Sequence, residues 1–383
     1  MDFGYSDEQQ AIVELASQVL AEHSSHERQR AVETSGGPRF DAELWKQLAE
    51  TGLLGTAVPE AQGGAGLGFL EVAAICEKVG RHTAAVPFLE TVVGGVLPIA
   101  EFGSEKQREE WLPRVAEGRA ILTAALQEDQ ADPAKPATSA RRDGAGWVLS
   151  GAKLPVAFAE LADLVLVPAT LDGGDVAVFL VDPKAKGVSL VPLATMTGQP
   201  ASLLRLDGVR VGEDAVLGGV GAGRLVLDGM RLRATAAQCA AGAGLCEAAL
   251  EMTAAYIKER KQFGQPIAMF QAVGHRAADA FIDVQAVRLT AQQACWRIAA
   301  GLPAESEVAL AKYWLAEAGA RVVAAAQHLH GGMGVDRDYP VHRFYLFAKQ
   351  LELDLGGATR QLLRIGDHLA EMPLGEVGAR FQP

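Results

Sequence analysis

The stretch 257–267 and the residues just after it carry side chains that together can bind a phosphate-bearing ligand. Arg260 offers a guanidinium group, Gln262 and Gln271 offer amides, and Phe263 offers an aromatic ring. A guanidinium binds phosphate through two parallel hydrogen bonds, and an aromatic ring packs against another planar group. The spacing is compatible with a rigid corner that presents these four side chains to a ligand with a phosphate group and an aromatic ring.

A purely structural explanation also fits this corner. Gly264 and Pro266 interrupt the helical pattern, and a new apolar run opens at Phe270. Arg260 and Lys261 lie in the last helical turn, where cations interact favourably with the helix dipole and the free carbonyl groups. On spacing alone this explanation is favoured, and the rest of the chain has to decide between the two.

Hydrophobic periodicity divides the chain into three parts. Helical spacing dominates the first part, short β-type runs separated by Gly, Pro and Asp turns dominate the second, and long helical runs return in the third. The β-type runs predict a small antiparallel barrel or sandwich, with a hairpin turn at 141–146. We therefore expect a mainly α fold with a β domain. The expected domains are an N-terminal helical domain (1–118), a middle β domain (119–222) and a C-terminal four-helix bundle (223–383).

The predicted bundle consists of long helical runs that are rich in small residues. Alanine and glycine let helix backbones approach closely, so the first of these helices is expected to be buried. The runs cover about 225–259, 268–300, 305–331 and 338–371.

Composition excludes several classes of protein. The 383 residues carry a net charge of −12, which argues against nucleic-acid binding. The acidic first residues lack the apolar segment of a signal peptide, and no uncharged apolar run reaches membrane-spanning length. The four cysteines show no metal-ligand spacing. We expect a cytoplasmic protein that binds no metal, no membrane and no nucleic acid.

Three motifs occur in order in the predicted bundle. They are Glu259-Arg-Lys-Gln-Phe-Gly-Gln-Pro-Ile267, Phe270-Gln-Ala-Val273 and His330-Gly-Gly-Met-Gly334. With the domain order, they make the whole chain resemble the acyl-CoA dehydrogenase family. The resemblance implies FAD bound between the β domain and the bundle, with its adenosine-diphosphate end held by the bundle of a second subunit. It also implies an acyl-CoA substrate and an electron-accepting flavoprotein.

The resemblance assigns FAD contacts to the corner. Arg260 corresponds to the family's arginine on the flavin pyrophosphate, and Phe263 to an aromatic residue beside the cofactor. Gln271 corresponds to a polar contact, and Gln262 lies between these positions in the same motif. The corner is thereby interpreted as part of a cofactor site.

The second set of implied contacts lies in the loop after the third predicted helix. Gly331 and Gly332 match positions where the backbone closely approaches the adenosine. The family's usual glutamine is replaced by His328, with Gln327 beside it, and either residue is a candidate for the contact. Alternatively, His328 and His330 serve only to cap the helix C-terminus.

The middle domain departs from the family pattern. A Thr-Glu-Pro-x-x-Gly-Ser-Asp type stretch is usual after the first strand, but this chain has Gln127-Glu-Asp-Gln-Ala-Asp132. The usual Lys-x-Trp-Ile-Thr is replaced by Lys153-Leu-Pro-Val-Ala157. The aromatic ring and the hydroxyl that flank the flavin are therefore missing, and flavin binding by this β domain is expected to be weaker or differently arranged.

The catalytic base is also missing from both positions where the family places it. The reaction removes a proton from the α carbon of an acyl thioester while a hydride leaves the β carbon, so it needs a carboxylate near the substrate. Those positions hold Gly356 and Ala234 here. Asp354 is the substitute considered, but a two-residue offset on a helix would turn its side chain away by roughly 200°.

Three hypotheses follow from these observations. The first is an FAD-dependent acyl-CoA dehydrogenase, catalysing α,β-desaturation, with an unassigned base. The second is a subunit of a mixed assembly, such as those that act on steroid side-chain thioesters, in which a related chain supplies the base. The third is a flavin monooxygenase on the same fold. The two missing glutamates and the altered β-domain motifs favour the second. A cofactor shared across subunits implies at least a dimer, and often a dimer of dimers, which would be a homo- or heterotetramer.

Overall fold

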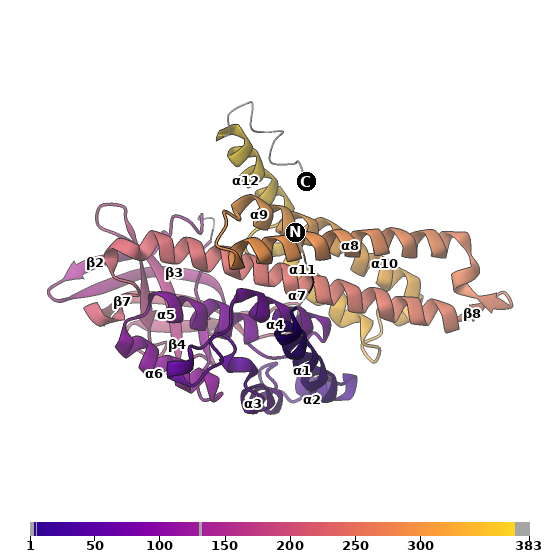
Figure 1. Ribbon diagram of the computed structural model, residues 1–383, viewed down its shortest axis with the longest axis horizontal. Helices are drawn as coiled ribbons and strands as arrows, with labels where there is room; N and C mark the ends of the chain where they lie inside the picture. Colours follow the sequence, from indigo (N-terminus) through magenta and orange to yellow (C-terminus); the bar gives the residue numbers. More distant parts are fainter. Residues whose placement is uncertain (1–3, 5, 130–131, 372–383) are drawn as a thin grey trace.

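A computed structural model describes residue 4 and residues 6–129 and 132–371 of the chain. The first third of the chain is helical, as predicted (Figure 1). Capping groups begin several of its helices: the Ser6 side chain accepts a hydrogen bond from the Gln9 backbone, and Asp41 caps α3 in the same way. The N-terminal helices are α1 (Asp7–His23), α2 (His26–Glu33), α3 (Ala42–Glu50), α4 (Phe69–Arg81), the π-helix η3 (Leu89–Val96), α5 (Leu97–Phe102) and α6 (Glu105–Ala116).

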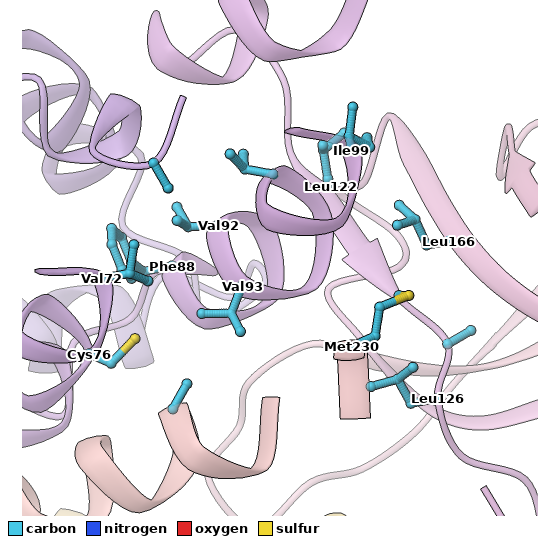
Figure 2. Close-up of a cluster of buried hydrophobic side chains, with 14 of the residues drawn as sticks. Val72, Cys76, Phe88, Val92, Val93, Ile99, Leu122, Leu126, Leu166 and Met230 are labelled. Carbon is cyan, nitrogen blue, oxygen red and sulfur yellow. The ribbon is translucent and has the colours of Figure 1, made fainter. Parts of the chain in front are cut away.

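The π-helix η3 lies where the N-terminal helices meet the sheet and the bundle. Its Val92 and Val93 are buried in the cluster drawn in Figure 2, between Cys76 of α4, Leu166 of the sheet and Met230 of the bundle. Buried contacts on several sides hold η3 in place. π-Helical turns are frequent at functional sites.

The middle of the chain forms one seven-stranded mixed sheet. Its order is β1-β4-β2-β3-β7-β6, with β5 paired to β4. The predicted hairpin is confirmed, since β2 and β3 pair in antiparallel register around Gly144. The strands are β1 (Leu122–Ala124), β2 (Ser139–Asp143), β3 (Gly146–Ala157), β4 (Leu164–Leu171), β5 (Val176–Val181), β6 (Val188–Pro192) and β7 (Ala201–Gly212).

The prediction of a purely antiparallel sheet is wrong in two pairings. β4 lies between β1 and β2 in space, and it runs parallel to both. The β2–β3 hairpin intervenes between β1 and β4 in the sequence, so the chain crosses over before β4 is added. Turn chemistry in the sequence reveals hairpins but not such crossovers.

The last part of the chain is a helical bundle, and α7 and α8 extend together away from the sheet (Figure 1). Small residues allow α7 to cross α4 closely, because a Cβ at Gly244 would lie 2.0 Å from the Glu77 carbonyl oxygen. The helices are α7 (Gly223–Glu259), α8 (Gln271–Ala299), α9 (Glu305–Trp314), the π-helix η7 (Leu315–Gly319), α10 (Ala320–His330), α11 (Val341–Leu353) and α12 (Ala358–Glu371).

The predicted continuous run 338–371 is wrong. The helix stops at Leu353 and restarts at Ala358, because Leu355 and Gly356 both adopt positive φ angles, of 54° and 97°. The break leaves residues 354–357 in a loop, and this loop contains Gly356, one of the two positions where the resemblance places the base. The domain boundaries at 118/119 and 222/223 stay a prediction; α6 ends at Ala116, β1 begins at Leu122 and α7 begins at Gly223.

Within the described ranges, no helix combines the length and the apolar character that crossing a membrane requires.

Candidate functional site

The predicted corner, from Arg260 to Gln271, lies at the C-terminal end of α7, where the β8–β9 hairpin projects from the molecule (Figure 1). Arg260 caps α7 through its backbone N–H, which donates to the Tyr256 carbonyl over 2.9 Å. Its carbonyl oxygen accepts a hydrogen bond of 2.8 Å from the Ile267 N–H, which closes the hairpin. The predicted corner is therefore a defined turn. The strands of the hairpin are β8 (Lys261–Gln262) and β9 (Gln265–Pro266).

The predicted cofactor-binding side chains of the corner are all exposed. Phe263 is 91% exposed at a φ of 52°, and its ring makes an edge-to-face contact with Phe270. The Arg260 guanidinium has no hydrogen bond or ion pair with any residue that the structure describes. Gln271 is exposed in the first turn of α8, and the Gln262 amide donates a hydrogen bond to the Lys261 carbonyl. Together they form an open surface and not a pocket.

The glycine loop lies beside the corner helix. The ring of His330 stacks on Tyr256 of α7 at 4.4 Å between centroids, so the end of α10 is fixed one turn before the corner begins. The Nδ1 atom of His330 lies 2.7 Å from the Ala326 carbonyl oxygen, which matches the predicted capping alternative for this histidine. The corner and the glycine loop therefore lie at the same end of the bundle.

The remaining predicted residues of the loop leave space for a ligand. A Cβ at Gly331 or Gly332 would meet nothing within 4 Å, and both glycines are exposed. His328 is exposed and Gln327 is half-buried, so His328 has the freer side chain of the two. Gly331 has a φ of 59°, which favours glycine.

A separate cavity of about 460 Å³ lies between the three parts of the fold. Its walls come from α4 and η3, from β1 and the loops of the sheet, from the middle of α7 and from the end of α11. Ala234, which is one of the two expected base positions, lines the cavity. Asp354 and Leu355 also line it, and they belong to the loop that contains Gly356, the other expected position. At 1.5 Å per residue along α7, Ala234 lies roughly 38 Å from the corner. The corner residues and the expected base positions therefore belong to different sites of this chain.

Asp354 points into the cavity, contrary to the helical-offset argument. It lies in the loop after α11, so the rotation of a continuous helix does not apply. Its carboxylate accepts hydrogen bonds from the Gln127 amide at 3.1 Å and the Gln238 amide at 3.3 Å. Burial raises the pKa of Asp354, although the charge of Lys312 and the two amides oppose that rise.

Gly356 itself is poorly suited to a glutamate. A Cβ there would lie 2.8 Å from Cδ of Arg360 and 3.2 Å from the Gln361 amide nitrogen, at a φ of 97°. The Gln361 amide also donates to the Gly356 carbonyl over 2.8 Å. The conformation of the loop therefore depends on the lack of a side chain at position 356.

Glu90 is a site residue that sequence reasoning missed. It lies on η3 and lines the cavity, and its carboxyl group accepts a hydrogen bond from its own backbone N–H. Burial raises the pKa of Glu90 to about 7, and the nearby charge of Asp354 acts in the same direction. The available signal was its isolation, because it is the sole charged residue in the apolar run 83–100.

Charged groups of the two altered β-domain stretches pair with each other and with α12. Glu128 and Lys153 form a buried ion pair of 2.7 Å, and Glu128 also accepts backbone hydrogen bonds from Ala137 and Thr138. Asp132 pairs with Arg360 at 3.3 Å. Residues 130 and 131 of the predicted stretch lie outside the described residues. The described charged residues of this stretch therefore form ion pairs and hydrogen bonds within this chain.

The comparisons with known proteins agree with this architecture. The N-terminal domain of acyl-CoA dehydrogenases matches residues 6–119, and the C-terminal domain matches residues 225–370. Acyl-CoA dehydrogenase FadE27 of Mycobacterium tuberculosis is 40% identical over 381 residues, which covers 97% of this chain and 100% of the relative.

Two solved structures show the same fold at similar identity. The ChsE4-ChsE5 complex from Mycobacterium tuberculosis contains a chain that is 41% identical, with a TM-score of 0.92 over 97% of this chain and 100% of that one. A variant of the steroid acyl-CoA dehydrogenase Tcur3481-Tcur3483 is 42% identical, with a TM-score of 0.89 over 95% and 98%. The chain therefore belongs to the acyl-CoA dehydrogenase family of FAD-dependent oxidoreductases, which act on the CH–CH group of acyl-CoA.

Proposed function

We propose that this chain works as one subunit of a two-chain acyl-CoA dehydrogenase, in which it holds part of the FAD and a related chain supplies the catalytic base. The observation that carries the proposal is the separation of the exposed corner from the cavity, roughly 38 Å along α7. A cofactor bound at the corner needs a second chain to complete its site.

The surface around the corner supports a second chain. Phe263, Met269, Phe281 and Ile282 are between 56% and 91% exposed, and they lie on the hairpin, the turn after it and α8. Exposed large apolar side chains are typical of a protein interface. A partner that covers Phe263 would also lie beside Arg260 in the same corner.

The corner residues fit the cofactor. Arg260 would bind the pyrophosphate through its two-pronged guanidinium, and Phe263 would pack beside the cofactor. Gln262, Gln271 and either Gln327 or His328 would donate or accept hydrogen bonds, and Gly331 and Gly332 would let the adenosine approach the backbone. When bound, FAD accepts the hydride from the β carbon of the substrate.

The chain's own cavity lacks what the reaction requires at the usual places. Ala234 carries no carboxylate, and Gly356 adopts a backbone conformation that disfavours one. The β-domain positions that would flank the flavin ring hold Pro155 and Ala157, which line the cavity, instead of an aromatic residue and a hydroxyl. These features support a partner as the source of the base.

The names of the relatives suggest the substrate class. One neighbour is a complex of ChsE4 with ChsE5, and another is a steroid acyl-CoA dehydrogenase named for two proteins, Tcur3481 and Tcur3483. We extend this to a thioester of a bulky steroid side chain as the substrate of the assembly. We also propose that the assembly works in the cytoplasm and passes its electrons to an electron-accepting flavoprotein.

The test is the visible spectrum of the purified protein. The full chain is expressed alone and together with a related chain encoded nearby, and each product is titrated with acyl-CoA under anaerobic conditions. We expect flavin absorbance and bleaching only in the co-expressed product. Flavin that bleaches in the chain alone would contradict the proposal, and NAD(P)H-dependent oxygen consumption would indicate a monooxygenase instead.

A further inference from the structure

The segment from Gly331 to Arg343 carries the glycine loop and the turn that leads into α11. Most of residues 331–338 are exposed, and a Cβ at Gly331 or Gly332 would meet nothing within 4 Å. Glycine loses more conformational freedom than any other residue when it is ordered, so such a loop costs free energy to hold in one conformation. The contacts that hold it therefore have to come from the elements beside it.

The first set of contacts comes from the bundle. The ring of Tyr339 lies 5.2 Å from the His330 ring, and His330 in turn stacks on Tyr256 of α7. The Tyr256 hydroxyl donates a hydrogen bond of 3.4 Å to the His330 carbonyl oxygen. These aromatic contacts fix both ends of the exposed turn against α7.

The second set of contacts comes from α2, far away in the sequence. His26, Arg30 and Glu33 are spaced i, i+4 and i+7, so they lie on one face of this helix. Arg30 pairs with Asp338 in the turn. Glu33 accepts two hydrogen bonds from the Arg343 guanidinium, of 2.7 and 3.0 Å, and Arg343 also donates to Nδ1 of His26 over 2.7 Å. Each residue of this face therefore contacts either the turn or the first turn of α11.

The Glu33–Arg343 pair is the strongest link between α2 and this segment. Arg343 is 3% exposed, and two parallel hydrogen bonds to a carboxylate fix its orientation as well as its distance. The buried Arg39 lies 3.5 Å from the same carboxylate, so Glu33 is the counter-charge for two buried guanidinium groups. The Arg30–Asp338 pair lies on the surface, where an ion pair contributes little.

We propose that Glu33 and Arg343 are positioning residues for the adenosine half of FAD. With α2 they hold the start of α11 and the turn before it, so that Gly331 and Gly332 keep the backbone conformation against which the adenosine would pack. A loop that is already held in its binding conformation loses less conformational entropy when the ligand binds, so affinity is higher. The proposal rests on the proposed function, because it needs an FAD whose adenosine lies at the glycine loop.

The test is the affinity of the two-chain assembly for FAD, measured by removing the flavin and following its fluorescence as it is added back. Glu33→Gln in this chain should weaken FAD binding about tenfold, because a residue can change affinity through a packed network without touching the ligand. Before FAD is added, amide hydrogen exchange over residues 331–340 should be faster in this variant than in the wild type. An unchanged FAD affinity or an unchanged exchange rate would overturn the proposal.

A matched control separates positioning from a general loss of stability. Asp41 is 4% exposed and accepts two hydrogen bonds from the Arg28 guanidinium, of 2.8 and 2.6 Å. Arg28 does not share the i, i+4, i+7 face of α2. Asp41→Asn should therefore lower the unfolding free energy but leave FAD affinity and the exchange over residues 331–340 unchanged. Equal losses of FAD affinity in Asp41→Asn and Glu33→Gln would show that the Glu33–Arg343 pair is only structural.

Arg343→Lys covers the case in which Glu33→Gln does not fold. Lysine keeps a positive charge beside Glu33, but it cannot form the two parallel hydrogen bonds of a guanidinium. FAD binding should weaken by a smaller factor, about threefold, and an unchanged affinity would overturn the role of Arg343.

The wild-type assembly separates this proposal from the proposed function. An assembly that binds no flavin would contradict the proposed function, and the positioning role with it. An assembly that binds flavin, but with the same affinity in Glu33→Gln, would overturn the positioning role alone.

Discussion

The corner at the end of α7 and the cavity near its middle differ in how completely this chain satisfies their polar groups. At the corner, Arg260 and Phe263 are exposed, and Arg260 has no partner among the described residues. In and behind the cavity wall, Asp354 has two amide partners and Glu128 is paired with Lys153. Polar groups at the corner are available to bind another molecule, whereas most of those around the cavity are bonded to each other and stabilise the fold. Changes in the two regions should therefore affect different properties.

The largest effect on stability is expected from Glu128→Gln, behind the cavity wall. The change leaves the Lys153 ammonium, which is 1% exposed, without its counter-charge. Removing one partner of a buried ion pair costs about 3–5 kcal/mol of unfolding free energy. Urea denaturation of the variant and the wild type at pH 7 measures the difference. A loss below about 1 kcal/mol would show that this part of the molecule is more tolerant than the comparison implies.

The same ion pair gives the wild type an acid-sensitive stability. Burial alone would raise the pKa of Glu128, but the charge of Lys153 and the hydrogen bonds from Lys153 and Thr138 outweigh burial and lower it. Because the folded pKa is below the unfolded value of about 4.3, the contribution is present above pH 4.3 and is lost as the pH falls through the folded pKa. Between pH 5 and pH 3, Glu128→Gln should lose less stability than the wild type.

Arg260→Ala should separate binding from stability at the corner. Without the guanidinium, flavin affinity in the two-chain assembly should fall by roughly tenfold or more, since a hydrogen bond to a charged group contributes about 1.5–3 kcal/mol. The unfolding free energy of the chain should change by less than about 0.5 kcal/mol, as for other surface substitutions. The ratio of flavin to protein absorbance after gel filtration measures the first effect. Lys258→Ala, an exposed cation in the same helical turn, is the matched control and should retain flavin.

Glu90→Gln should stabilise the chain at alkaline pH. The pKa of Glu90 is raised to about 7 in the folded state, so its contribution is fully present below the unfolded pKa and is lost as the pH rises through 7. Glutamine cannot ionise, so the variant should exceed the wild type by about 3 kcal/mol at pH 8 and match it near pH 4. Thermal or urea unfolding across this range tests the sign. A variant that is less stable than the wild type at pH 8 would show that ionised Glu90 is well solvated.

Gly356→Ala gives the smallest expected effect. A non-glycine residue in the left-handed region costs about 1–2 kcal/mol, and the close Cδ atom belongs to the Arg360 side chain, which is 40% exposed. Unfolding free energies of the wild type and Gly356→Ala measure this cost. Gly357→Ala in the same loop is the control, because that residue does not have a positive φ angle. Equal costs at both positions would remove the backbone explanation for the missing glutamate.

The sequence predicted the corner better than the cavity for a physical reason. A helix end, a Gly-x-Pro turn and a new helix start are local signals, so the turn around Phe263 could be expected from neighbouring residues alone. The cavity is made by residues far apart in the sequence, such as Glu90, Gln238 and Asp354. No local pattern brings these three residues together.

Two errors arose from treating regular patterns as continuous. The run 338–371 looked like one helix, and the positive φ angles at Leu355 and Gly356 were not foreseen. The Asp354 side chain was therefore predicted to turn away from the base position, whereas it lines the cavity. The strand pattern revealed the hairpin around Gly144 but not the parallel neighbours of β4. Glu90 was overlooked because an isolated glutamate in an apolar run has no motif, although its isolation was visible.

The most direct test of the account is the ratio of flavin to chains in the purified two-chain assembly. The ratio comes from the absorbance of released FAD and from amino-acid analysis of each chain. If this chain only lends its corner to a site completed by its partner, we predict one flavin for each pair of unlike chains. One flavin for every chain would contradict the account, because this chain would then complete a flavin site of its own.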